Sequence, residues 1–177
     1  MQRQAIEQLL PSIYRAPGPG TPLDAVLEIA AALPQPVEEL LGSVDDLFDP
    51  LRAPEELVPY LARWVDLDRF LVTGGGEGAR TVMPSGLGRL RELCACAAEL
   101  SRLRGTRQGL QRFLEVATGV NGFRIEENSD ADGREKPFHL RLVAPEAARE
   151  YEALIHAIVA FEKPAHVSYT PEELRFE

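Results

Sequence analysis

One short stretch of the chain, residues 103–119, predicts two helices joined by a tight corner. Gly105 can adopt the left-handed backbone conformation that ends a helix. Thr106 follows it, and its hydroxyl can accept a hydrogen bond from an orphan amide of the next helix. That helix has one apolar face, formed by Leu110, Phe113, Leu114 and Ala117. Gly119 fits the position just past its end, after Thr118.

The first two thirds of the chain have the spacing of helices, divided by proline and glycine. Residues 1–10 predict a short helix that Pro11 ends. Thr21 and Pro22 form an N-cap and first-turn pair for a helix that reaches about residue 33. Three more helices are predicted at about residues 37–48, 54–65 and 87–103. The apolar side of the first of these carries Val37, Leu40, Leu41, Val44 and Leu47.

The C-terminal third changes to the alternating spacing of strands. Residues 123–126 alternate apolar and polar side chains, and residues 138–142 do the same beyond a polar loop. A helix at about residues 145–161 and a last strand around residues 167–169 follow. The crossover between the second and last strands should be right-handed, with these strands parallel. We therefore predict an α+β fold, with a mostly helical N-terminal two thirds and a small C-terminal ββαβ subdomain.

The two faces of the predicted sheet differ in chemistry. The apolar face should pack against the helix at residues 145–161, and it carries Phe123, Ile125, Phe138, Leu140, Leu142, Val167 and Tyr169. The opposite face should meet water or a polar partner, and it carries Arg124, Glu126, His139, Arg141, His166 and Ser168. Arg124 and Arg141 are therefore interface candidates.

A linker rich in proline and glycine, residues 17–20, separates the N-terminal segment from the rest. We predict three parts: an N-terminal interaction helix and linker at residues 1–20, a helical domain at 21–120, and the small α+β subdomain at 121–177. The apolar side chains before the linker are predicted to bind a partner rather than this chain's own core. They are Ile6, Leu9, Leu10, Ile13 and Tyr14.

Composition and motifs favour a protein without catalytic activity. A net charge of −9 argues against a nucleic-acid surface, which needs a basic stripe. No stretch is long and apolar enough to span a bilayer, and the N-terminus lacks the apolar segment of a signal peptide. No nucleophile or phosphate-binding motif is present, so we expect no enzyme and no cofactor. Trp64, three residues after Leu61, is predicted to be a core anchor.

Potential metal ligands do not converge in the sequence. The three histidines, expected at the surface, are His139, His156 and His166. Cys94 and Cys96 should point to nearly opposite sides of a helix, which disfavours both a disulfide and a zinc site. Residues 128–133 copy the start of a calcium loop, but the glutamate needed at its twelfth position is replaced by His139. A plain hairpin turn is favoured there, with a weak cation site as the alternative.

Several segments in sequence order resemble the phage tail protein I family. The most distinctive resemblance runs through Arg104-Gly105-Thr106, Gly109-Leu110, Thr118-Gly119 and Ile125-Glu126. Other matching segments are residues 10–15, 48–50, 53–54, 57–64 and 163–166, with Tyr169 at the end. The resemblance covers about residues 10–171. Residues 71–88 depart from it, because the family usually has a shorter lead into its long helix.

The resemblance implies a structural subunit of a baseplate wedge in a contractile phage tail or contractile injection system. Such a subunit would join larger wedge subunits, with sheath, spike or hub proteins as further partners, and it would assemble in the bacterial cytoplasm. A different class stays open, namely a helical adaptor or regulator that binds a peptide or small ligand. The isolated chain separates them, because a wedge subunit should associate through apolar patches and an adaptor should be monomeric.

Overall fold

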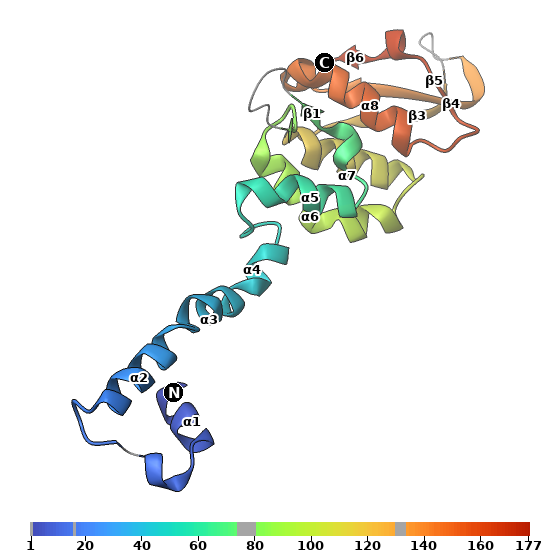
Figure 1. Cartoon of the computed structure of the whole chain (residues 1–177). Coiled ribbons are helices and arrows are strands. Elements are labelled where there is room, and N and C mark those ends of the chain that lie inside the picture. Colours follow the sequence, from blue (N-terminus) through green and yellow to red (C-terminus); the bar gives the residue numbers. More distant parts are fainter. Residues whose placement is uncertain (1, 16, 74–80, 130–133) are drawn as a thin grey trace. The chain divides into compact units, whose positions relative to one another are not determined.

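The computed structural model describes residues 2–15, 17–73, 81–129 and 134–177 (Figure 1). The chain forms two compact units, Met1–Asp46 and Leu47–Glu177. Helices occupy the N-terminal part, and a small sheet lies in the C-terminal part, so the predicted α+β class is confirmed. The Gly-rich stretch 74–78 and the centre of the 128–133 loop lie outside the described residues.

The first unit consists of short helices with little core. Helix α1 (Gln2–Leu9) packs on α2 (Pro22–Ala32), and Arg3 of α1 forms ion pairs with Asp24 and Glu28 of α2. Thr21 caps α2 as predicted, because its hydroxyl accepts a hydrogen bond from the Asp24 amide. Among the described residues of this unit, Leu27 alone is buried.

The helix predicted at residues 37–48 is divided in the structure. Helix α3 (Gln35–Gly42) ends before Ser43, and α4 (Val44–Phe48) begins after it. The Ser43 hydroxyl donates to the Leu40 carbonyl oxygen at 3.1 Å, which satisfies an acceptor that a continuous helix would use itself. Glycine followed by serine is a weak helix-forming pair, and the break follows from that local preference.

The second unit begins with a helical layer. A 3₁₀ turn η2 (Glu55–Leu57) leads into α5 (Val58–Trp64), and a second turn η3 (Asp68–Phe70) precedes the short pair β1 (Val72–Thr73) and β2 (Thr81–Val82). The long helix α6 (Leu87–Arg102) packs on α5 and on α7 (Arg107–Thr118).

The corner between α6 and α7 has the predicted geometry. Gly105 has a φ of 76° and Gly119 a φ of 73°, both left-handed. The Thr106 hydroxyl accepts a hydrogen bond from the Gly109 amide at 3.0 Å. Gly109 has a further role, because a Cβ there would lie 2.1 Å from the Leu103 carbonyl oxygen. The corner therefore needs a residue without a side chain at Gly109 for close helix contact.

A four-stranded sheet completes the second unit. Strand β3 (Arg124–Ser129) pairs antiparallel with β4 (Glu135–Ala144), and β4 pairs parallel with β5 (Ser168–Tyr169), as predicted. The connection contains the turn η4 (Glu146–Tyr151) and helix α8 (Glu152–Glu162). Beyond the turn η5 (Pro171–Glu173), β6 (Arg175–Phe176) also pairs parallel with β4. The strand β6 was not predicted.

Helices and sheet of the second unit share one core. The predicted apolar face of α7 is buried throughout, and so are Ile155 and Ile158 of α8. They join Ile125 and Leu142 of the sheet in a single apolar cluster. Figure 1 shows helix α8 running along the sheet formed by β3, β4, β5 and β6.

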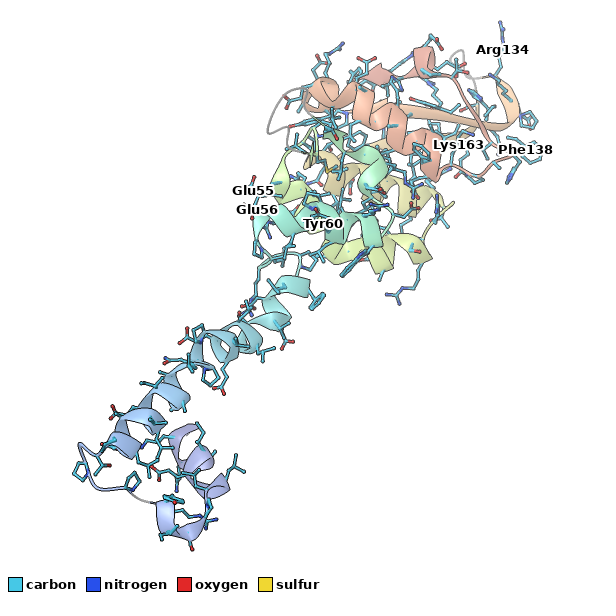
Figure 2. All side chains as sticks on the ribbon, in the orientation of Figure 1. Glu55, Glu56, Tyr60, Arg134, Phe138 and Lys163 are labelled. Atoms are coloured by element: carbon cyan, nitrogen blue, oxygen red, sulfur yellow. The ribbon has the colours of Figure 1, made fainter. Side chains whose placement is uncertain are left out.

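The phase predicted for β4 is wrong at its beginning. Phe138 was expected in the core, but its side chain, which is labelled in Figure 2, is exposed, and His139 is only 1% exposed. Asn128 and Phe138 both have positive φ angles, and the β3–β4 register shifts between Glu127 and Ser129. A bulge of this kind reverses which side chains point to each face.

Trp64 is not a core anchor, because its side chain is 69% exposed. The buried face of α5 carries Val58, Leu61 and Ala62. Trp64 lies two residues after Ala62, which is roughly 200° around the helix. Trp64 is also the last residue of α5, so it lies at the end of that buried face.

Candidate partner-binding surfaces

The first unit exposes a row of aliphatic side chains on α2 and α3. We call this row the α2–α3 apolar surface, and it consists of Val26, Ile29, Leu33, Val37, Leu40 and Leu41. Each is between 57% and 73% exposed. Isolated exposed aliphatic residues are ordinary, but a row of them on consecutive helices of a nearly coreless unit is a candidate surface for binding another protein.

The N-terminal interface candidates divide into two sets. Leu9, Ile13 and Tyr14 are exposed, whereas Ile6 and Leu10 are half-buried. Because α1 packs on α2, part of this segment contributes to the first unit itself. The exposed set remains available to a partner, and a role in partner binding stays a prediction.

The two arginine candidates on the sheet differ in accessibility. Arg124 is exposed and forms an ion pair with Glu177. The Arg141 side chain is 11% exposed and pairs with Glu126 at 3.0 Å. The Arg141 Nε is buried without a hydrogen-bond partner in the described residues. Arg124 is therefore the better-placed contact for a neighbouring subunit.

Residues of the predicted motif connect the corner between α6 and α7 to the C-terminal end of α8. Arg104 donates to the Phe161 carbonyl oxygen at 3.2 Å and lies 3.6 Å from the Glu162 carboxylate. The Thr118 hydroxyl donates to the Leu114 carbonyl oxygen and accepts from the Val120 amide. Leu110 is buried in the core. In this structure the motif therefore joins α6 to α7 and fixes both of them to α8.

His139, predicted at the surface, is itself buried, and it contacts a cluster of polar side chains that are partly exposed. Its Nδ1 is 2.8 Å from Ser168 Oγ, and its Nε2 is 2.7 Å from a Glu173 carboxylate oxygen. Lys136 Nζ lies 3.5 Å from the same Nε2. The cluster links β4 to β5 and η5, so it ties the C-terminal segment to the sheet.

Serine, histidine and glutamate in line resemble a nucleophile and its base, but the hydrogen bonds disfavour that chemistry. The Ser168 hydroxyl donates to the Phe138 carbonyl oxygen at 3.1 Å. The hydroxyl has a single hydrogen, so while it donates to that carbonyl it does not also donate to Nδ1 of His139, as a serine nucleophile would to its base. We interpret the set as structural.

The other polar candidates are also placed separately. His156 Nδ1 lies 2.9 Å from the Tyr169 hydroxyl, and His166 contacts the ring of Phe138 edge-on. Burial raises the pKa of the Cys94 thiol to about 11, which makes it a poor nucleophile at neutral pH. Within the described ranges no group of three His, Cys, Asp or Glu side chains could hold a metal ion. None of the described helices is long and apolar enough to cross a membrane.

The described residues form a first unit that leaves apolar helix surfaces uncovered and a second unit that has a core of its own. The family model described as phage tail protein (Tail_P2_I) matches residues 20–166. The chain therefore belongs to this phage tail protein family, as the sequence resemblance indicated, and it is a structural component of a phage tail. No curated protein matches the chain.

Proposed function

We propose that this tail protein is a wedge subunit of the baseplate, which binds larger wedge subunits through the helices of its first unit. The α2–α3 apolar surface is the observation that carries the proposal. Burying one Leu, Ile or Val side chain contributes roughly 1.5–3 kcal/mol. Six such side chains together are comparable to the association cost of roughly 4–15 kcal/mol.

The spacing of these residues suits a partner helix. Val37, Leu40 and Leu41 of α3 stand three and four residues apart, which is the anchor spacing of a helix that lies in an apolar groove or bundle. Contacts of the second unit through Arg124 would brace the wedge on a different face. Sheath, spike and hub proteins are further candidate neighbours.

The test is co-expression with the products of neighbouring tail genes, followed by co-purification. Leu33→Asp combined with Leu40→Asp should abolish the complex, because two carboxylates would be buried without partners. Gln108→Asp with Ala153→Asp, at exposed positions on α7 and α8 of the second unit, adds the same charge elsewhere and should leave the complex intact.

The isolated chain gives a second measurement. It should self-associate at the α2–α3 apolar surface in analytical ultracentrifugation, and the Leu33→Asp/Leu40→Asp variant should be monomeric. A complex that survives these two substitutions would contradict the proposed surface. A monomeric wild-type chain that binds no tail protein would favour the adaptor.

A further inference from the structure

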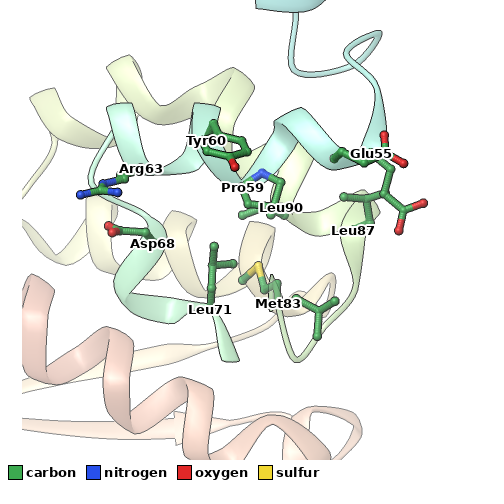
Figure 3. Close-up of a pocket in the computed structure, with 11 residues that line it drawn as sticks. Glu55, Pro59, Tyr60, Arg63, Asp68, Leu71, Met83, Leu87 and Leu90 are labelled. Atoms are coloured by element: carbon green, nitrogen blue, oxygen red, sulfur yellow. The ribbon is translucent and has the colours of Figure 1, made fainter. Parts of the chain in front are cut away.

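The second unit contains a pocket of about 470 Å³ (Figure 3). All its lining residues belong to the second unit, so it exists without any contribution from the first. Its apolar wall consists of Pro59, Leu71, Val82, Met83, Leu87 and Leu90. Met83 and Leu90 are buried core residues, so the core itself fixes the floor of the pocket.

The rim of this pocket is acidic. Glu55 lies at one end, and Arg63 and Asp68 lie at the other (Figure 3). Glu56 lies next to Glu55 along the turn before α5 (Figure 2). Among the described residues that line the pocket, three carboxylates and one guanidinium give a net negative charge, which favours a basic ligand.

Exposed aromatic rings extend the pocket along α5. Tyr60 lines the pocket, and Trp64 follows it by four residues, so the two share a side of the helix. Trp64 stacks on Phe48 with a centroid distance of 6.1 Å, and both rings are more than half exposed. Tyr and Trp are the residues that contribute most at protein interfaces.

We infer that this pocket and the Phe48–Trp64 pair bind a basic amphipathic helix of another tail protein. An apolar side chain of that helix enters the pocket, and lysine or arginine side chains beside it meet Glu56 and Asp68. The inference rests on the assembly role proposed above, but it concerns a separate surface on a separate unit.

The probes are three synthetic helical peptides tested on the full-length chain at physiological salt. One contains leucine and lysine, the second replaces each lysine by glutamate, and the third replaces each leucine by serine. Trp64 is the single tryptophan of the chain, so its fluorescence gives one signal that originates at this surface. We expect a saturable blue shift with the leucine–lysine peptide, and binding at least about tenfold weaker for the other two.

Matched charge variants separate the pocket from the acidity of the whole chain. Glu56→Lys with Asp68→Lys should weaken binding of the leucine–lysine peptide about tenfold or more. Glu99→Lys with Glu172→Lys makes the same change in net charge at exposed positions outside the pocket, and it should change the affinity less than about twofold. Equal weakening by both pairs would overturn the inference.

The variant of the first unit distinguishes this inference from the proposed function. Leu33→Asp with Leu40→Asp should leave the Trp64 fluorescence response unchanged while it removes the complex with wedge partners. Loss of the response in that variant would place the peptide on the α2–α3 apolar surface and refute the pocket site. An intact response with unaffected wedge binding would refute the proposed function and support the pocket.

Discussion

Helices α3 and α7 have a similar spacing of aliphatic residues, but these residues are exposed on α3 and buried on α7. Both carry aliphatic residues three and four apart, with Val37, Leu40 and Leu41 on α3 and Leu110 and Leu114 on α7. The α7 residues are buried under α6, α8 and the sheet, whereas the α3 residues are exposed. The spacing therefore establishes which side of a helix is apolar, and the rest of the assembly decides what covers it.

The same contrast holds for the two units. The second unit buries a continuous apolar cluster and can be stable alone, whereas the first buries only Leu27 among its described residues. Stability follows the apolar area removed from water. We expect the first unit to gain most of its order from partners, and the following experiments test this difference.

The largest effect is expected in the core of the second unit. Ile155→Asp places an unpaired charge among fully buried side chains and should cost roughly 4 kcal/mol or more, enough to unfold the unit. Urea denaturation followed by circular dichroism measures it. Ala153→Asp on the exposed side of α8 is the control and should unfold near the wild-type midpoint. If the Ile155→Asp protein stays folded, the side of α8 that carries Ile155 does not face the core, which would contradict the structure.

Gly109→Ala should be the next most damaging change. The new methyl group would lie 2.1 Å from the Leu103 carbonyl oxygen, so α6 and α7 must separate, at a cost of roughly 2–3 kcal/mol. Gly88→Ala in α6 is a matched control, because its Cβ meets nothing within 4 Å, and it should stabilise by roughly 0.5–1 kcal/mol. Similar urea midpoints for both variants would show that the helices do not meet this closely.

Gly105→Val tests the corner through backbone strain alone. The position is left-handed but open, with the nearest atom to a Cβ at 3.7 Å, so the expected cost is roughly 1–3 kcal/mol. Gly105→Asn should lose less, since asparagine tolerates this conformation. The thermal midpoints of the two variants make the comparison, and an unchanged midpoint for valine would exclude a left-handed corner.

Removal of residues 1–46 should leave the thermal midpoint of the second unit unchanged. The buried cluster lies entirely after residue 46, so no core contact is lost. Differential scanning calorimetry of the full chain and of residues 47–177 tests this, and co-purification should show that the shorter chain no longer binds wedge partners. A shortened chain of markedly lower stability would mean that the units share a core.

The smallest effect concerns the contact between α1 and α2. Hydrogen bonds from Arg3 and from the Gly20 amide lower the pKa of the Asp24 carboxyl. A carboxyl with a lowered folded pKa contributes stability that is present above its unfolded pKa, about 4, and is lost as the pH falls through the folded pKa. Carbon NMR titration of Asp24 should show this, and Arg3→Gln should return its pKa toward the ordinary value. If Arg3→Gln leaves the pKa of Asp24 unchanged, the contact between Arg3 of α1 and Asp24 of α2 is contradicted.

Local signals in the sequence predicted the corner well and the start of β4 poorly. Gly105, Thr106 and Gly119 act through their own backbone or their nearest amides, so their roles can be read from adjacent residues. The burial of His139 depends on a bulge with Phe138 in a left-handed conformation and on Glu173, far along the chain. Simple alternation does not contain that information.

The candidate surfaces divide in the same way. The apolar side of α3 was visible as a period in residues 37–48, but its exposure was not. The pocket beside α5 was not predicted, because Leu71, Met83 and Leu90 meet only when η3, β2 and α6 pack together. The prediction that Trp64 anchors the core is wrong, because large aromatic residues occur both in cores and at interfaces and the sequence does not distinguish the two.

The sequence by itself determined the helix–corner–helix unit, the α+β class and the family, because capping residues, periodicity and short motifs act over a few neighbouring positions. Tertiary structure alone decided which apolar faces are covered, since burial depends on elements far apart in the chain. Packing around Leu103 explains the glycine at 109, and the C-terminal segment encloses His139. Among the described residues of the first unit, no element covers the α2–α3 apolar surface.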